Sequence, residues 1–317
     1  MWVPAPQSAL GPLEAGLSPD ELRMPEALGG LEVPPVFVAG SARSGTTFTL
    51  DVFGQHPEVC TLFETWLFTQ THGLTSIFAQ REWDPLVSRS AWERAAVQPA
   101  AVQLLSYREM VGELGDLVAT WLMRAVRQEH RFLVLKEPLD VHAAAIMFPE
   151  ARFVHVIRDG RDVALSMRRA SESWNTSMGV GLPMSWRAEA WRRQVENVTA
   201  HREYLGSRYL EIRFEDLRAD VVATARTLFD FAGIPYDDRV LELVRAGTEL
   251  SSYSETARLS GFRGAGAIGA WREQFSRRDA IGFNRAAGDL LVELGYERDR
   301  SWWRELLPAA FQSRTVG

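Results

Sequence analysis

The stretch FVAGSARSGTTFTL, residues 37–50, constrains the fold of this chain more than any other part of the sequence. A short apolar run ends at Gly40, a polar loop runs to Gly45, and a helix-forming segment follows. This pattern is typical of a loop whose backbone N–H groups bind phosphate. In the familiar nucleotide loop a lysine follows the second glycine directly. Here two threonines take that place, and the nearest cation is Arg43 inside the loop.

Short apolar runs recur along the chain and alternate with helical patterns. They predict strands at residues 36–39, 59–62, 131–138, 151–158 and 209–217. Intervening patterns predict helices at residues 46–54, 141–148, 221–232 and 277–294. Because the strand runs are apolar on both faces, we predict an α/β fold with a central parallel sheet flanked by helices.

The predicted domain spans residues 33–300. Residues 1–32 are rich in proline, glycine and alanine and predict a loosely ordered extension. Residues 301–317 are assigned to a C-terminal tail. Two segments, 63–130 and 171–190, are predicted to be helical and loop insertions in the domain.

Composition narrows the class of protein. The net charge of −6 argues against a nucleic-acid binder, which is normally basic. No run approaches the length of a membrane span, and the first residues lack the pattern of a secretory signal. The single cysteine, Cys60, fits a reducing compartment. We therefore expect a cytoplasmic protein with no stable membrane insertion.

Cations stand at the ends of two predicted strands. The chain has 35 basic residues, of which one, Lys136, is a lysine, and it ends the run LVLK. Arg158 follows the next run, VHVI. Ligands of open parallel sheets bind beyond the carboxyl ends of the strands. This site is therefore predicted to meet anionic charge with side chains rather than with a metal ion.

A small-molecule kinase is the first alternative. Kinases of this architecture place a strand-end carboxylate near the phosphates to hold magnesium with ATP. Glu137 and Asp159 each lie one residue past a strand-end cation and are the candidates for that role. A non-enzymatic protein that retains the nucleotide-binding fold is the second alternative.

Four motifs together resemble the sulfotransferases that use 3′-phosphoadenosine 5′-phosphosulfate (PAPS). FVAGSARSGTTFTLDVFGQHPEV is similar to their 5′-phosphosulfate loop, and FVHVIRDGRDVALSM to their 3′-phosphate motif. IRFEDL and GAWREQFS resemble two further segments of the family. Order and spacing match from Val33 to Tyr296. The nearest branch comprises bacterial enzymes akin to the tyrosylprotein and carbohydrate sulfotransferases, with an R-S-G-T-T loop. The resemblance implies the P-loop nucleotide-binding architecture of sulfotransferases.

The resemblance also implies how the donor is held. The residues that would bind its 5′-phosphate and orient the sulfuryl group are Arg43, Ser44, Gly45, Thr46 and Thr47, with Arg43 also counted as catalytic. Arg158 and Ser166 would bind the 3′-phosphate, which ATP lacks. Lys136 would stabilise charge on the leaving phosphate, with 3′,5′-adenosine bisphosphate (PAP) as the product and no metal required. Arg263, in a glycine-rich segment, is a further candidate for the 3′-phosphate, as are Arg168 and Arg169.

A catalytic base is implied as well. Glu64 lies where the tyrosylprotein branch carries its catalytic glutamate, and general-base catalysis contributes about 10²–10⁴ in rate. The cytosolic branch uses a histidine instead, which leaves His56, His72 and His142 as rivals.

The two insertions would form the acceptor pocket. Both are rich in aromatic residues, methionine and leucine, and they predict an apolar or aromatic acceptor that carries a hydroxyl. The sequence leaves open whether the chain forms a homodimer.

Overall fold

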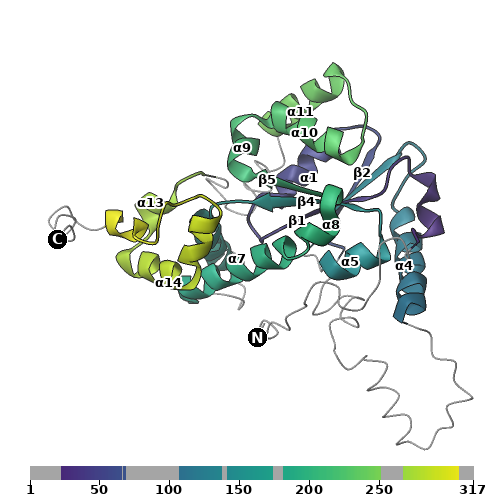
Figure 1. The fold of residues 1–317 in the computed structure, drawn as a ribbon. Helices are drawn as coiled ribbons and strands as arrows, with labels where there is room; N and C mark the ends of the chain where they lie inside the picture. The colour runs from purple at the N-terminus through teal and green to yellow at the C-terminus, as the bar shows by residue number, and fades with distance from the viewer. Residues whose placement is uncertain are drawn as a thin grey trace, which may run out of the picture.

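Five parallel strands form the centre of the fold, as the computed structural model shows (Figure 1). The structure describes residues 23–65, 67–68, 107–137, 141–173, 181–250 and 267–306. The strands lie in the order β2-β3-β1-β4-β5. Their bounds are β1 Val36–Gly40, β2 Val59–Phe63, β3 Phe132–Lys136, β4 Arg152–Ile157 and β5 Tyr209–Arg213. The predicted α/β fold with a parallel sheet is confirmed.

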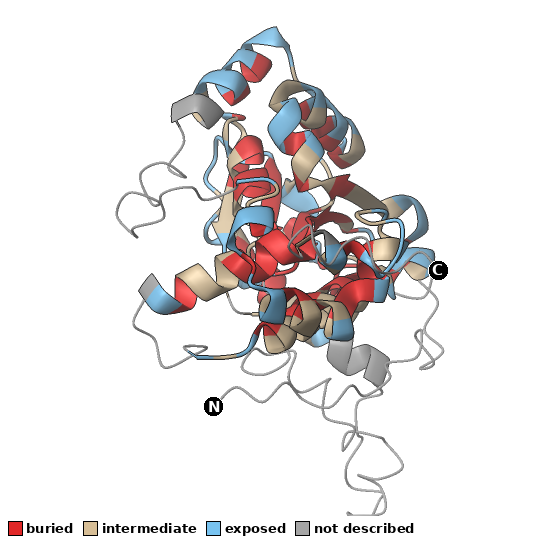
Figure 2. Ribbon diagram, turned by 90° about the vertical axis from the view of Figure 1, so that its left-hand side faces the viewer, coloured by how far each residue is buried: buried red, intermediate tan, exposed pale blue. Residues whose placement is uncertain are grey.

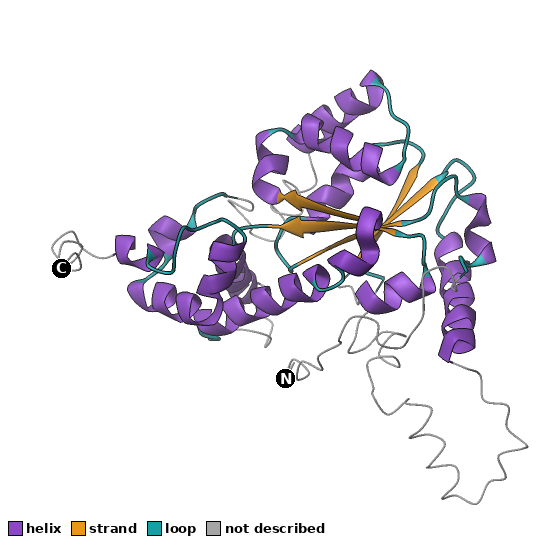
Figure 3. Cartoon of the chain, viewed as in Figure 1, coloured by secondary structure: helices purple, strands orange, loops and turns teal. Residues whose placement is uncertain are grey.

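Helices surround this sheet and continue beyond the carboxyl ends of some of its strands (Figure 3). The longer ones are α1 Thr46–Gly54, α4 Tyr107–Met123, α6 Gly160–Ser173, α7 Met184–Thr199, α10 Val221–Ala232, α11 Asp238–Leu250 and α14 Arg277–Glu293. The shorter ones are η2 Glu26–Gly30, α5 Val141–Met147, α8 Arg202–Leu205, η5 Gly206–Arg208, α9 Phe214–Ala219, α13 Trp271–Gln274 and η6 Trp302–Leu306.

Residues of the central strand β1 alternate between two hydrophobic layers. Phe37 and Ala39 pack into a cluster with α4 and α5. Val36 and Val38 face the other way and pack against α1, α10 and α11. Figure 1 shows these two sets of helices on opposite faces of the sheet, and Figure 2 shows buried residues concentrated between the layers. Burial on both faces explains why these strand sequences are continuously apolar.

The register of β1 brings three strand ends together. Val38 pairs with Lys136 of β3, and Gly40 pairs with Val156 of β4. Because all three strands run in the same direction, the loop after Gly40 lies between Lys136 and the end of β4. The sequence-predicted cations therefore flank the glycine loop.

A third hydrophobic cluster extends the fold beyond the carboxyl ends of β4 and β5. It joins α6, α7, α13, α14 and η6 around Trp191, Trp271 and Phe283. In Figure 1 these helices lie on the side toward which the arrows of β4 and β5 point. This cluster supports the chain that follows β4.

The predicted strand at 209–217 is too long. β5 ends at Arg213, and residues 214–219 form α9. Phe214 and Leu217 are both buried, and their spacing of three suits a helical turn rather than a strand. The acidic pair Glu215 and Asp216 in the first turn also favours the helix N-terminus.

Residues near both predicted domain boundaries reach the hydrophobic clusters. Leu28 is buried in the cluster with α4 and α5, and Trp302 is buried against Trp271. The boundaries at residues 32 and 300 stay predictions. Among the described helices, none combines the length and the apolar character that crossing a bilayer requires.

We predict that Gly160→Ala destabilises the fold by about 1–3 kcal/mol, the usual cost of overpacking. A Cβ at this position would lie 2.4 Å from the buried ring of Trp191. The control is Gly112→Ala within α4, where a Cβ meets no atom within 4 Å. The control should gain about 0.5–1 kcal/mol from helix propensity. Urea unfolding measures both, and equal shifts would contradict the packing assignment.

Candidate functional site

The two glycines of the loop are required by its conformation. Gly40 and Gly45 have φ values of 151° and 106°, which disfavour residues with a Cβ. A Cβ on Gly45 would also lie 2.2 Å from the ring of Phe214, and one on Gly40 would lie 2.6 Å from the carbonyl oxygen of Val156. The loop therefore packs directly against the ends of β4 and β5.

A glutamine far along the chain holds the start of the loop. The Oε1 atom of Gln194, on α7, accepts hydrogen bonds from the Ser41 hydroxyl and the Ala42 N–H, each at 2.8 Å. Gln194 was not predictable from the sequence, because a glutamine in an amphipathic helix carries no local signal of such a contact. This residue fixes the loop relative to α7.

The second half of the loop presents polar groups at the start of α1. Ser44 is buried, and its Oγ has no hydrogen-bond partner among the described residues. Thr46 and Thr47 form the first turn of α1, where backbone N–H groups have no intrahelical partner. The Arg43 Nε donates to the Ser166 hydroxyl of α6 at 3.2 Å. The arrangement suits an anionic group, because a phosphate would satisfy these donors.

Arg158 lies immediately beside this loop. Its Nη1 donates to the Arg43 carbonyl at 3.1 Å, and its Nη2 donates to the Ala267 carbonyl at 2.9 Å. The guanidinium stacks over the Phe214 ring at 4.5 Å. Arg158 is 3% exposed, and its Nε lacks a partner in the described part of the chain. The site thus brings together Arg43, Arg158 and Ser166.

Lys136 and Glu64 form an ion pair on the other side of the loop. The Lys136 Nζ contacts the Glu64 Oε1 directly and lies 4.6 Å from the centre of the Phe63 ring. The Glu64 N–H donates to the Lys136 carbonyl at 2.8 Å, which continues the pairing of β2 with β3 by one residue. The two residues predicted to act on the transferred group therefore touch.

Two predicted catalytic residues have unusual backbone conformations. Within the described residues, positive φ occurs outside glycine only at Arg43, with 72°, and at Glu64, with 45°. Such conformations cost about 1–3 kcal/mol each and cluster at functional sites. The surrounding hydrogen bonds maintain both.

The carboxylates that a kinase would need are bound to other side chains. Glu137 accepts from the backbone N–H of Thr65 at 2.8 Å and also from its hydroxyl. Asp159 accepts from the Arg161 guanidinium, with Nη2 and Oδ2 at 2.7 Å. These partners disfavour the kinase alternative, since each carboxylate is oriented by a protein group.

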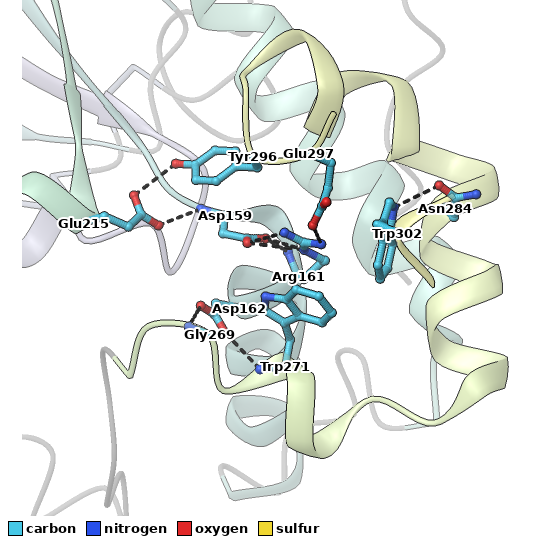
Figure 4. A network of polar contacts seen from close by, with 10 residues as sticks. All are labelled: Asp159, Arg161, Asp162, Glu215, Gly269, Trp271, Asn284, Tyr296, Glu297 and Trp302. Carbon is cyan, nitrogen blue, oxygen red and sulfur yellow. Dashed lines mark hydrogen bonds and ion pairs between the residues drawn. The ribbon is translucent and has the colours of Figure 1, made fainter. Parts of the chain in front are cut away.

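A buried polar network supports the segment that reaches Arg158 (Figure 4). Asp162 accepts from the N–H groups of Gly269 at 2.7 Å and Trp271 at 3.1 Å. Burial raises the pKa of Asp162, and the neighbouring Arg158 opposes this rise. Asp162 therefore holds the chain that places the Ala267 carbonyl on Arg158.

The RDGRD motif thus combines a predicted site residue with structural ones. Arg161 is 1% exposed and lies 3.7 Å above the Trp271 ring while pairing with Asp159 and Glu297. Glu215 of α9 joins the network by accepting from the Asp159 N–H at 3.1 Å. The supporting roles of Asp162 and Arg161 were not predicted from the sequence, because both depend on contacts with residues far along the chain.

The described rivals of Glu64 have other partners. The His56 Nδ1 accepts from the Glu58 N–H, and its Nε2 lies 3.0 Å from the Pro235 carbonyl. His142, on α5, lies with its ring 6.0 Å from that of His201. His72 lies outside the described residues. Of the described candidates, Glu64 alone contacts Lys136.

Two of the additional arginines predicted for the 3′-phosphate contact other side chains, and the third lies outside the described residues. Arg168 pairs with Asp279 at 3.1 Å, and Arg169 donates to Gln274 at 2.7 Å. Both therefore contact the α13–α14 region. Arg263 lies outside the described residues.

We predict a pH-dependent stability from His142. Burial, followed by the charge of His201, lowers its pKa from 6.5 to about 4. The folded state keeps this ring neutral while the unfolded chain protonates below pH 6.5, so stability falls as the pH drops from 6.5 toward 4. Relative to His142→Leu, the wild type should lose about 2 kcal/mol between pH 7 and 5 in urea unfolding. If the wild type and His142→Leu lost the same stability between pH 7 and 5, the assignment of this pH dependence to His142 would be wrong.

Comparison with known proteins agrees with this geometry. The model of the sulfotransferase family matches residues 34–238. Protein-tyrosine sulfotransferase A of Caenorhabditis elegans is 28% identical over 215 residues, covering 66% of this chain and 52% of that protein. Protein-tyrosine sulfotransferase 1 of Danio rerio is 26% identical over 220 residues, covering 66% of this chain and 56% of that protein. The chain belongs to the sulfotransferase family. It spans about half the length of these curated relatives.

Solved structures share the fold. A mouse sulfotransferase, SULT7A1 complexed with PAP, has a TM-score of 0.52 at 16% identity and covers 88% of this chain and 91% of its own. The sulfotransferase domain of the Synechococcus PCC 7002 olefin synthase has a TM-score of 0.51 at 19% identity. The match covers 85% of this chain and 98% of that domain. At these identities the likeness concerns the fold.

Proposed function

We propose that this protein transfers the sulfuryl group of PAPS to a hydroxyl of an acceptor. The observation that carries the proposal is the meeting of three strand ends, where the glycine loop lies between the Lys136–Glu64 pair and Arg158. The family assignment supports it. The two halves of this site contribute different chemistry, one binding the donor and the other transferring its sulfuryl group.

Donor binding is assigned to the loop and to Arg158. The 5′-phosphate lies on the loop, with the ligands Arg43, Ser44, Gly45, Thr46 and Thr47. The 3′-phosphate lies against Arg158 and Ser166. Two buried groups without partners among the described residues, the Ser44 Oγ and the Arg158 Nε, support this assignment. PAP in the mouse structure gives it further support. Arg263 stays a candidate ligand.

Transfer is assigned to Lys136 and Glu64, with Arg43 orienting the sulfuryl group. Glu64 takes the proton of the acceptor hydroxyl as the new O–S bond forms in line with the bond that breaks. The bond from sulfur to the 5′-phosphate oxygen breaks, and its electron pair leaves with PAP. Lys136 stabilises that charge, in the place where a kinase uses magnesium. The direct contact between Lys136 and Glu64 supports a shared role.

The acceptor is proposed to be apolar or aromatic around its hydroxyl. Phe63 is 56% exposed and directly precedes Glu64, so an apolar group can cover it at the site. The similar protein-tyrosine sulfotransferases favour a phenolic hydroxyl. Much of the predicted pocket, including residues 69–106 and 174–180, lies outside the described residues. A cytoplasmic location stays a prediction, and a homodimer stays open.

We predict that Arg158→Ala weakens PAP binding by about 10–100-fold, because a charged hydrogen bond contributes about 1.5–3 kcal/mol. AMP, which lacks the 3′-phosphate, should lose much less. Calorimetry with PAP and with AMP separates 3′-phosphate binding by Arg158 from the contacts that Arg158 makes with the loop. Arg168→Ala, which removes the pair with Asp279, is the matched control and should change neither affinity. Equal losses for PAP and AMP would refute the assignment, and stronger stabilisation by magnesium–ATP than by PAP would favour a kinase.

We predict that Glu64→Gln lowers turnover by about 10²–10⁴, because the amide has the same shape but cannot take a proton. PAP affinity should stay within about threefold, since Glu64 is assigned to the acceptor. Release of PAP from PAPS, with a tyrosine peptide as acceptor, measures turnover. The control is Glu58→Gln, which removes a surface ion pair with Arg131. Unchanged turnover in Glu64→Gln would place the base elsewhere.

A further inference from the structure

We propose that Glu137 is a positioning residue that holds Glu64 against Lys136. The inference rests on the proposed function, because it assigns Glu137 a role in preparing the base of that reaction. Glu137 follows Lys136 directly in the chain, as Thr65 follows Glu64. The ends of β2 and β3 are therefore joined by two successive side-chain contacts, Glu64 with Lys136 and Thr65 with Glu137.

The contacts of Glu137 are those of a fixed group. The residue is 3% exposed, although it has a carboxyl group. One oxygen, Oε1, accepts both the backbone N–H of Thr65, at 2.8 Å, and the Thr65 hydroxyl. A buried carboxylate that accepts two hydrogen bonds from one residue restrains both its backbone and its side chain.

The restraint on Thr65 acts beside Glu64, whose backbone would otherwise return to a more common conformation. Glu64 has a φ of 45°, which a residue with a Cβ seldom adopts without support. Its N–H is held by the Lys136 carbonyl on one side, and Glu137 holds the next peptide N–H on the other. Between these two anchors the Glu64 carboxylate points at the Lys136 ammonium.

Glu137 thus acts through Glu64. Without the Glu137 carboxylate, residue 65 loses both of these restraints, and Glu64 can return to a common conformation that moves its carboxylate from Lys136. The assigned donor ligands lie on the glycine loop, in the first turn of α1, directly after β4 and on α6. Donor affinity should therefore not depend on Glu137. Loss of positioning should lower kcat and leave PAP binding unchanged.

Lys136 is the one lysine in the sequence, which makes its environment directly measurable. Acetylation by acetic anhydride, followed by mass spectrometry of the peptide around Lys136, reports how far Glu64 covers the amine. We expect Glu137→Ala to raise the labelling rate about tenfold, to the rate of Glu64→Ala. Glu137→Gln keeps an oxygen acceptor in the same place and should stay near the wild type.

A double-mutant comparison separates positioning from general loss of structure. Glu137→Ala should lower transfer from PAPS to a tyrosine peptide about 100-fold in the wild-type background. In a Glu64→Gln background the same change should cost less than about threefold, because the base is already absent. Glu58→Gln, at the opposite end of β2, is the control for removal of a glutamate charge.

The outcomes distinguish the inference from the proposed function. Unchanged Lys136 labelling in Glu137→Ala would overturn the positioning role whatever the activity, as would additive losses in the Glu64→Gln background. Increased labelling in Glu137→Ala, with recovery in Glu137→Gln, would support the positioning role even if the wild type releases no PAP. A wild type that neither binds PAP nor transfers from PAPS would refute the proposed function alone.

Discussion

The site depends on the hydrogen bonds that the buried guanidinium of Arg158 donates to two backbone carbonyls. The guanidinium joins the glycine loop, through the Arg43 carbonyl, to the C-terminal segment, through the Ala267 carbonyl. A buried charge is costly unless it is solvated by the protein or paired. Two carbonyls and the face of Phe214 provide part of that solvation. Asp162 lies close enough for its pKa to respond to Arg158. An anionic ligand would complete the environment.

The rest of the structure keeps this cation and its neighbours in place. The parallel pairing of β1 with β3 and β4 sets the order of the strand ends. Helices of the third hydrophobic cluster then add polar contacts. Gln194 of α7 binds the glycine loop, and Asp162 of α6 binds the segment that begins at residue 267. Such contacts cost little once the hydrophobic clusters have fixed the helices. Apolar packing therefore determines where the polar site forms, and polar contacts determine its geometry.

Much of the site was predictable because strand-end chemistry is local in sequence. Lys136 and Arg158 each end an apolar run, and parallel pairing alone brings such ends together. The strand predicted at residues 209–217 was too long because the buried spacing of Phe214 and Leu217 becomes clear only against the neighbouring layers. The binding roles of Arg43 to Thr47, and of Ser166, stay predictions, although the structure places these residues together.

The sequence by itself determined the parallel sheet, the glycine loop and the identity of the strand-end cations, since these follow from apolar runs and turn residues that are contiguous in the chain. Only the tertiary structure decided that Lys136 faces Glu64, that Glu137 restrains Thr65, and that Gln194 holds the loop. These contacts join residues far apart in the sequence. Their geometry depends on strand order and helix packing, which no local pattern encodes.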